Sequence, residues 1–510
     1  MAAAEEAHKN IMVVMGALML TLLLAALDQT IVSTALPRIA SDFNALNELS
    51  WVVTAYLIAS AITTPLYGKI SDLYGRKKML IVAVIIFLSG SALCGAAQNI
   101  TELVIFRGLQ GLGAGGLIPL VLAAIADVVP IRERGKYQGL FGAVFGLASV
   151  VGPLLGGLFT DTLSWRWIFY INIPLGLLAM WAIAARLPVH VRRVEHAIDY
   201  LGALLLAAGT SSLLLVAVWG GSTYPWNSHI IIGLSMLAIS AIGLFIYQEF
   251  SAKEPLLPMG LFRNSIFSVA SALSFVSGMA MFAAIIFLPE YQQVVRGYSA
   301  TKSGLLMLPL ILGLLTASIV SGRIISKTGK YRLFPIGGFI LTGFGLFLLS
   351  HLSLTTSQWL LSLWMLIVGL GIGSTMQVMT LAVQNATDPK HLGTATSAVT
   401  FFRSIGASLG VAIFGALLAN RIVVHLKDLL PASSLTAAGT TPSIGSAAQI
   451  QALPPPIANA VLQAFVLSFQ EVFLWTVPFV ALAFLISLFL RDVPLRTLAR
   501  EEAEGVAFEM

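Results

Sequence analysis

Fourteen long apolar runs divide this chain of 510 residues. A helix needs about 20 apolar residues to cross the hydrocarbon layer of a membrane, and each run is close to that length. Only 10% of the residues are charged, whereas a typical soluble domain has about 25%. The sequence therefore predicts an all-α polytopic membrane protein with fourteen transmembrane helices. The predicted spans are residues 12–35, 49–68, 79–98, 103–126, 138–160, 166–186, 200–219, 229–249, 266–288, 304–324, 334–352, 358–384, 394–420 and 471–490.

The basic residues predict the orientation of these spans. Of the 29 Lys and Arg residues, 21 fall on the side of the N-terminus, six fall on the opposite side and two fall within spans. Loops on the cytoplasmic side of a membrane carry an excess of Lys and Arg. We therefore expect a multi-pass protein of a bacterial inner or plasma membrane with both termini in the cytoplasm. This topology accounts for the net charge of +6, so no nucleic-acid partner is expected.

Residues that carry catalytic or metal chemistry are scarce. The one cysteine, Cys94, excludes a disulfide framework and a cysteine-based metal cluster. The seven histidines lack the spacing of metal ligands, and no glycine loop ends in Gly-Lys-Ser or Gly-Lys-Thr. We therefore expect no cofactor, no metal and no enzymatic activity.

Two loops share a pattern that predicts an internal repeat. Residues 68–78 and residues 322–332 both open with glycine, a base and isoleucine, and both close with a base. Glycine and a base also recur at corresponding places within the two loops. The repeat predicts two six-helix bundles related by a pseudo-two-fold axis, residues 1–190 and 263–510, with two inserted helices in residues 191–262. An external loop, residues 421–470, is expected in the second bundle, with a short interfacial helix at 457–469.

Asp28 lies far from both ends of the first predicted span. A carboxylate near mid-bilayer costs about 2.5–3.5 kcal/mol on insertion scales, so such a residue usually faces a cavity or a partner and marks an ion or proton path. Arg107, in the fourth span, is expected at a comparable depth. Burial favours the neutral carboxyl group and a nearby arginine favours the charged one, a balance that suits a proton carrier. A static salt bridge between the two spans is the alternative.

Several stretches resemble motifs of one transporter family. Residues 68–78 resemble the signature loop of the major facilitator superfamily, and residues 107–116 resemble its arginine motif in the fourth span. Residues 27–37 and 165–174 are similar to stretches of the fourteen-span drug:proton antiporter family. Small residues of the fifth span resemble the glycine-proline motif of drug exporters. They are Gly142, Gly146, Gly152, Pro153, Gly156 and Gly157.

The resemblance implies a gate on the cytoplasmic side. The matching loop residues are Gly68, Asp72, Gly75 and Arg76. In the family, the acid in the position of Asp72 lies near a helix N-terminus of the other half, and the arginine meets an acid that corresponds to Asp127. The second loop has Ser326 in place of Asp72, so we expect it to lock less well.

The glycines of the fifth span would let helices approach closely. The resemblance links that close seam to export rather than uptake, with simple packing as the alternative.

Other polar and aromatic residues within spans are candidates for a substrate cavity, although packing explains each. They are Gln29, Tyr56, Gln110, Asn172, Phe275, Phe282 and Trp364. Glu290, after Pro289, is a candidate for proton coupling or cation recognition. An external latch with Arg38 and an exposed rim charge are the alternatives for it. Arg403 is expected to be structural and to pair with backbone or lipid headgroups.

These expectations predict a monomeric, proton-coupled antiporter that exports hydrophobic, often cationic, small molecules by alternating access, as multidrug efflux proteins do. An exporter of a lipid or of one specific metabolite is the alternative within transport. A membrane sensor or scaffold is the alternative outside it. Besides protons, substrate and membrane lipid, an envelope adaptor or lipoprotein on the external loop is a candidate partner.

Overall fold

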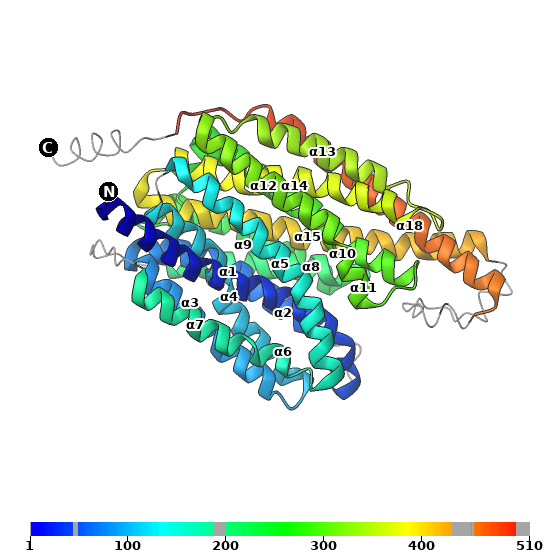
Figure 1. Cartoon of the computed structure of the whole chain (residues 1–510). Coiled ribbons are helices and arrows are strands. Elements are labelled where there is room, and N and C mark those ends of the chain that lie inside the picture. Colours follow the sequence, from blue (N-terminus) through cyan, green and yellow to red (C-terminus); the bar gives the residue numbers. More distant parts are fainter. Residues whose placement is uncertain are drawn as a thin grey trace.

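The computed structural model describes residues 2–43, 49–129, 131–187, 199–221, 223–430, 450 and 453–495, and its regular structure is helical (Figure 1). Among these residues, 12 helices are long and apolar enough to cross a membrane. Two shorter apolar helices, Val144–Thr160 and Leu333–Leu349, coincide with the two remaining predicted spans. The predicted all-α membrane architecture is thus confirmed.

The helices fall into two sets that flank an inserted pair. The first set is α1 (Ala2–Phe43), α2 (Leu49–Tyr74), α3 (Arg76–Ala96), α4 (Ile100–Val128), α5 (Ile131–Thr162), α6 (Trp167–Tyr170) and α7 (Asn172–Arg186). The inserted pair is α8 (Tyr200–Trp219) and α9 (His229–Ser251). The second set is α10 (Ser265–Val294), α11 (Ala300–Leu305), α12 (Leu308–Thr328), α13 (Leu333–Leu349), α14 (Gln358–Ala386), α15 (Leu392–Leu429) and α18 (Pro455–Ser487). Short 3₁₀ helices, Met259–Arg263 and Pro389–His391, precede α10 and α15.

Short polar side chains begin several of these helices. The side chain of Asn99 accepts a hydrogen bond from the backbone N–H of Glu102, and Ser357 caps α14 in the same way through Leu360. Such caps satisfy backbone donors that have no partner within the helix. They explain why these spans begin where the apolar runs meet Ser or Asn.

Both loops of the predicted repeat contain a glycine with a positive φ. Gly75 joins α2 to α3 with a φ of 93°, and Gly329 ends α12 with a φ of 73°. Both values lie in the left-handed region that glycine adopts without the steric cost of a side chain. The repeated glycines therefore share a positive φ, but ψ is 143° at Gly75 and −3° at Gly329, so the two turns differ in detail.

Buried apolar residues form a separate core in each set. The largest cluster of the first set is drawn from residues 14–187, and the cluster of the second set also includes Leu206 of α8 and Phe245 of α9. We call the two sets the N-terminal and C-terminal halves. They meet along α5 and α12 and along α2 and α15.

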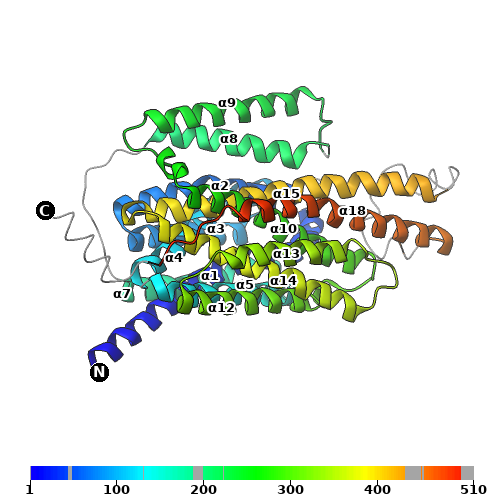
Figure 2. The same cartoon turned by 90° about the horizontal axis from the view of Figure 1, so that it is seen from above.

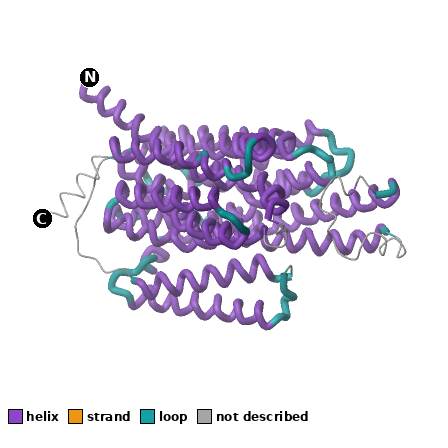
Figure 3. The backbone as a smooth tube through the Cα atoms, turned by 90° about the horizontal axis from the view of Figure 1, so that it is seen from below, coloured by secondary structure: helices purple, strands orange, loops and turns teal. Residues whose placement is uncertain are grey.

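The inserted pair stands to one side of both halves (Figures 2 and 3). α8 contacts α2 of the N-terminal half and α15 of the C-terminal half. Near the C-terminal end of α2, the ammonium group of Lys69 forms an ion pair at 2.7 Å with Glu254, a residue that follows α9. The pair is therefore attached to the N-terminal half at more than one level.

The start of α1 and the end of the described chain after α18 lie at the same end of the bundle, which we call the termini end (Figure 1). At the far end, α15 and α18 extend beyond the other helices, and Glu471 pairs with Arg421 at 2.7 Å and with His425 at 3.0 Å. The expected interfacial helix at 457–469 is wrong, since these residues form part of α18. No Gly or Pro interrupts the chain between Ile457 and Val477, so the helix continues. The connection between α15 and α18 is therefore shorter than the predicted external loop, residues 421–470. Residues 431–449 lie outside the described part of the chain.

Candidate functional site

Asp28 lies on α1, and its carboxylate is enclosed by donors from two other helices. Its side chain has no exposed surface. Oδ2 accepts a hydrogen bond from Arg107 Nη1 at 2.9 Å, and Oδ1 accepts from Gln110 Nε2 at 2.8 Å and from Asn172 Nδ2 at 2.9 Å. The buried charge is therefore fully compensated, as a carboxylate within a membrane requires.

Arg107 is held as firmly as its partner. Nη1 also donates to Gln110 Oε1 at 2.8 Å, and Nε donates to the backbone carbonyl of Val52 at 3.2 Å. The ring of Tyr56 lies 4.1 Å from the guanidinium carbon, within the range of a cation–π contact. The structure thus brings Asp28 and Arg107 to the same depth and into contact.

The cluster also contains a residue that sequence reasoning missed. Ser91 on α3 accepts a hydrogen bond from Asn172 Nδ2 at 3.0 Å and donates to the Phe169 carbonyl at 2.9 Å. A lone serine in an apolar run carries no signal of this role. In contrast, Asn172 Oδ1 and the Tyr56 hydroxyl are buried without a hydrogen-bond partner among the described residues. Polar atoms with unused capacity therefore remain in the cluster around the carboxylate.

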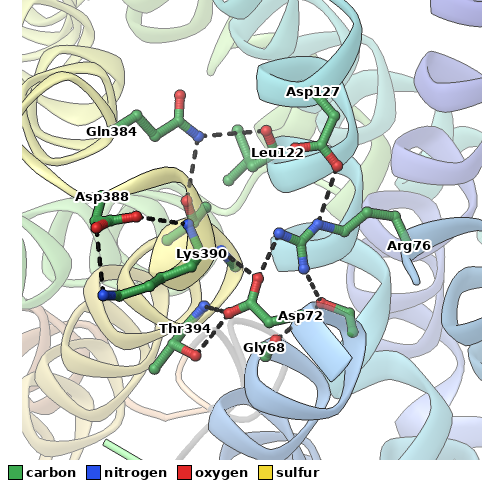
Figure 4. A network of polar contacts seen from close by, with 12 residues as sticks. Gly68, Asp72, Arg76, Leu122, Asp127, Gln384, Asp388, Lys390 and Thr394 are labelled. Carbon is green, nitrogen blue, oxygen red and sulfur yellow. Dashed lines mark hydrogen bonds and ion pairs between the residues drawn. The ribbon is translucent and has the colours of Figure 1, made fainter. Parts of the chain in front are cut away.

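A second site closes the termini end (Figure 4). Asp72, at the end of α2, accepts hydrogen bonds from Gly393 N at 3.0 Å and from Thr394 N and Oγ1 at 2.7 Å each. These donors belong to the start of α15 in the other half, where the helix dipole favours negative charge. Asp72 thus ties the two halves together.

Arg76 extends this tie to α4. It forms ion pairs with Asp72 and with Asp127, the latter at 3.2 Å. Nearby, Gln384 on α14 donates to the Leu122 carbonyl at 3.3 Å and to Thr396 Oγ1 at 3.2 Å. The termini end is therefore closed by contacts among α2, α4, α14 and α15.

The space at Gly68 is equally tight. A Cβ atom there would collide with the Ser397 side chain of α15. The loop motif thus needs glycine because α2 and α15 lie in direct contact.

The second loop is tied only within its own half among the described residues. Ser326 Oγ donates to the Gly322 carbonyl of its own helix at 2.9 Å. The backbone N–H groups of Tyr331 and Arg332 donate to Asp492 Oδ1 at 3.0 and 2.9 Å. The second loop, which has Ser326 where the first loop has Asp72, therefore makes no such link between the halves among the described residues.

The small residues of α5 lie between the halves. A Cβ atom at Gly152 would collide with Thr30 of α1, and one at Gly146 would collide with Ile311 of α12. Thr30 Oγ1 also donates to the Ala148 carbonyl at 2.9 Å. These glycines let α5 lie against a helix of each half.

The remaining members of the motif follow the same seam where they are described. A Cβ atom at Gly157 would lie 3.8 Å from Thr301 Oγ1, and Pro153 faces Gly304 of α11. Gly156 is buried, while the surroundings of Gly142 lie outside the described residues.

The candidate cavity residues separate into two groups. Gln110, Asn172 and Tyr56 belong to the Asp28 cluster and are at most 1% exposed. Gln29 is half-buried. The aromatic candidates lie instead in the core of the C-terminal half, where they pack with other apolar residues. They are Phe275, Phe282 and Trp364.

Two charged side chains of the C-terminal half, Glu290 and Arg403, have no hydrogen-bond or ion-pair partner among the described residues. Glu290 is half-buried on α10 and makes no hydrogen bond or ion pair with any described residue. Arg38 pairs with Asp42 at 3.3 Å, so the latch with Glu290 is not formed, and burial excludes a fully exposed rim charge.

Arg403 on α15 is only 8% exposed, and it too has no described partner. The expected pairing of Arg403 with backbone is therefore not formed among the described residues. Its pairing with lipid headgroups stays a prediction.

Comparison with known proteins agrees with this architecture. The family model described as Major Facilitator Superfamily matches residues 18–411. An MFS-type transporter of Mycobacterium tuberculosis is 43% identical over 95% of this chain and 70% of its own. The multidrug transporter MdtP of Bacillus subtilis is 37% identical, covering 96% of this chain and 94% of its own. The solved structure of a proton:xylose symporter superposes with a TM-score of 0.63 at 15% identity, covering 98% and 99% of the two chains.

Proposed function

The chain belongs to the major facilitator superfamily, and we propose that it exports hydrophobic, often cationic, small molecules in exchange for protons. Two relatives from Bacillus subtilis, each 37% identical, are named a multidrug transporter and a multidrug resistance protein. The glycine face of α5, which packs against both halves, suits a seam along which those halves move. Residues 1–190 and 263–510 act as the two moving halves of a monomer, with residues 191–262 inserted.

The observation that carries the proposal is the sealed carboxylate of Asp28 with its three donors. All three partners are hydrogen-bond donors, so the arrangement suits the charged form of the carboxylate. A proton on Asp28 would remove the counter-ion of Arg107 and weaken the charge-assisted bonds to Gln110 and Asn172. Protonation therefore changes how α1, α4 and α7 are held together.

The closed end supplies the other part of the cycle. The excess of basic residues assigns the termini end to the cytoplasm, so the Asp72 and Arg76 contacts close the cytoplasmic side. One proton that crosses 100 mV supplies about 2.3 kcal/mol, and one charge-assisted hydrogen bond contributes about 1.5–3 kcal/mol. Because Asp72 alone accepts three such bonds, we expect substrate binding and protonation both to contribute to opening.

Proton release by the purified protein tests this function. Ethidium, a hydrophobic cation, is added to the detergent-solubilised protein in weak buffer, and the pH is followed with an indicator dye. We expect proton release from the wild type and none from Asp28→Asn. Asp42→Asn is the matched control, because Asp42 lies on the same helix but pairs with Arg38.

Two outcomes contradict the proposal. Release that persists in Asp28→Asn removes Asp28 as the proton carrier. Ethidium binding without release from the wild type removes proton exchange altogether.

A further inference from the structure

The side-chain amide of Asn172 on α7 is bonded through only one of its two ends. Nδ2 donates to Asp28 Oδ1 at 2.9 Å and to Ser91 Oγ at 3.0 Å. Oδ1 is buried and accepts no hydrogen bond from a described residue, and Asn172 as a whole has no exposed surface. A buried carbonyl oxygen without a donor costs free energy, so this end of the amide is available to a new donor.

The charge of Asp28 explains why the amide of Asn172 points this way. A carboxylate only accepts hydrogen bonds, so it requires the N–H₂ end of the amide. A protonated carboxyl group has one O–H donor, which requires an acceptor. Because Asp28 has no exposed surface, that acceptor has to come from the residues around it as long as the cluster stays sealed.

The acceptors around Asp28 are not equally available. Gln110 Oε1 already accepts a hydrogen bond from Arg107 Nη1 at 2.8 Å. Because Arg107 stays charged at physiological pH, it holds Gln110 in this orientation whether or not Asp28 carries a proton. Two buried oxygens of the cluster accept no hydrogen bond from a described residue, namely Asn172 Oδ1 and the Tyr56 hydroxyl. Of these two residues, only Asn172 already contacts the carboxylate through a hydrogen bond.

Ser91 on α3 can follow a change in the amide. Its hydroxyl group donates to the Phe169 carbonyl of α6 at 2.9 Å, while its oxygen accepts from Asn172 Nδ2. A serine hydroxyl has one donor and two acceptor sites, and its hydrogen rotates to suit its partners. When Asn172 presents its carbonyl in place of its N–H₂ group, the same hydroxyl becomes the donor to it.

We propose that Asn172 and Ser91 form a reversible hydrogen-bond relay that responds to protonation of Asp28. A proton from solution binds Oδ1, the oxygen that faces Asn172, while Oδ2 stays bonded to Arg107. The amide then turns about its last side-chain bond, and its carbonyl accepts from the Asp28 hydroxyl and from Ser91. The new O–H bond is the only covalent change. Each orientation leaves one end of the amide without a partner, so the charge of Asp28 decides between them.

The relay rests on the proposed exchange of protons, and it explains how a neutral Asp28 is held while it is sealed. Rotation of the Ser91 hydroxyl releases the Phe169 carbonyl, so the protonation state of α1 reaches α6 through α7 and α3. Asn172 and Ser91 are therefore positioning residues, which act through Asp28 and not on the exported molecule.

Infrared spectroscopy of the purified protein in heavy water tests the relay. The difference between spectra at acidic and alkaline pD contains the C=O and O–D stretching bands of each carboxyl group that takes up a deuteron. The bands of Asp28 are those that Asp28→Asn removes. The O–D frequency rises when the group loses its hydrogen-bond acceptor, whereas loss of a donor to the carboxyl group leaves that acceptor in place. We expect the O–D band of Asp28 to move to higher frequency in Asn172→Leu, and to move by less in Ser91→Ala.

A conservative variant and a matched control accompany this test. Asn172→Gln keeps an amide and should keep the O–D band closer to its wild-type position than Asn172→Leu does. Thr21→Val should leave the bands unchanged, because Thr21 is buried on the same helix as Asp28 but donates to the Ala17 carbonyl of that helix. Ser91→Ala removes a single oxygen atom, so it tests the relay independently of whether Asn172→Leu folds.

Two results would overturn the relay without removing Asp28 as the proton carrier. In the first, the O–D band of Asp28 keeps its wild-type frequency in Asn172→Leu and in Ser91→Ala. In the second, the band moves in Tyr56→Phe instead, which makes the Tyr56 hydroxyl the acceptor. If no carboxyl band depends on Asp28, the carrier and the relay are both rejected. A shift in Asn172→Leu without proton release on ethidium supports the relay and rejects proton exchange with that substrate.

Discussion

In the N-terminal half, Asp28 and Arg107 hold each other at 2.9 Å and share Gln110. In the C-terminal half, Arg403 and Glu290 have no partner among the described residues. In the first arrangement the two charges neutralise each other without a ligand, so it is suited to respond to a change in its own charge. The second is incomplete, so it is suited to binding something. The comparison supports the proposal that proton exchange belongs to the N-terminal half.

The repeated loops diverge in the same direction. The loop of the N-terminal half reaches α15 through Asp72, whereas the loop of the C-terminal half bonds to Asp492 of its own half. One loop therefore links the two halves, and the other bonds within a single half. The internal repeat has kept the glycine and changed the partner.

Arg107→Gln should have the largest effect, because it leaves Asp28 buried without its counter-ion. Loss of one partner of a buried pair costs about 3–5 kcal/mol. We expect the melting temperature of the detergent-solubilised protein to fall by several degrees. The half-exposed Arg421 provides the control Arg421→Gln, which should change it little. An unchanged melting temperature in Arg107→Gln would show that the pair does not stabilise the fold.

The corresponding substitution in the C-terminal half, Arg403→Gln, should raise the melting temperature instead of lowering it. Arg403→Gln removes a buried charge that has no partner, and relief of such a group is worth about 1–3 kcal/mol. We expect the melting temperature to rise in the absence of any acidic ligand. A fall as large as that of Arg107→Gln would mean that Arg403 already has an acceptor, and the contrast between the halves would fail.

Asp72→Asn should open the termini end more readily than Ser326→Asn. The first substitution removes a charge that accepts three hydrogen bonds from the other half, and the second affects a bond within one helix. With a cysteine at Thr400 as reporter, a membrane-impermeant maleimide should label Asp72→Asn roughly tenfold faster, which corresponds to about 1.4 kcal/mol. Ser326→Asn should leave the rate unchanged. Equal acceleration by both would deny that the loops differ.

Lys69→Gln should give the smallest effect. The ion pair between Lys69 and Glu254 joins the N-terminal half to the inserted helices, but Glu254 is 31% exposed, and partly exposed pairs contribute about 0.2–1 kcal/mol. We expect labelling of the same reporter to change by about fivefold at most. Lys253→Gln, one position from Glu254 and exposed, is the control. If Lys69→Gln changed the labelling rate as much as Asp72→Asn, the inserted helices would be as important as the Asp72 contacts in keeping the termini end closed.

Depth along a span was predictable, whereas the direction of a side chain was not. Asp28 and Arg107 could be matched because each lies a countable distance from the end of an apolar run. Gln110 and Asn172 were expected in a cavity, since a polar residue in such a run signals burial without saying which neighbour it faces. Their role as partners of Asp28 depends on how α4 and α7 are rotated, and one sequence does not contain that information.

Long-range pairs and helix ends set the other limits. Lys69 and Glu254 are 185 residues apart, and no local pattern connects them. The lack of a partner for Arg403 was equally hidden, because a lone arginine in a span looks the same whether or not an acceptor is near. The sequence did not predict that α18 begins at Pro455, because the hydropathy of its first residues is lower than that of the membrane span that follows. In each case the deciding contact forms between segments that fold onto each other.

The position of α8 makes the two seams between the halves unequal. Where α2 meets α15, a helix of the inserted pair lies across the outside of the junction. The junction of α5 with α12 has no such cover among the described helices and relies on the fit of its glycines. Among the described helices, an additional helix therefore separates only the α2–α15 seam from the surrounding bilayer.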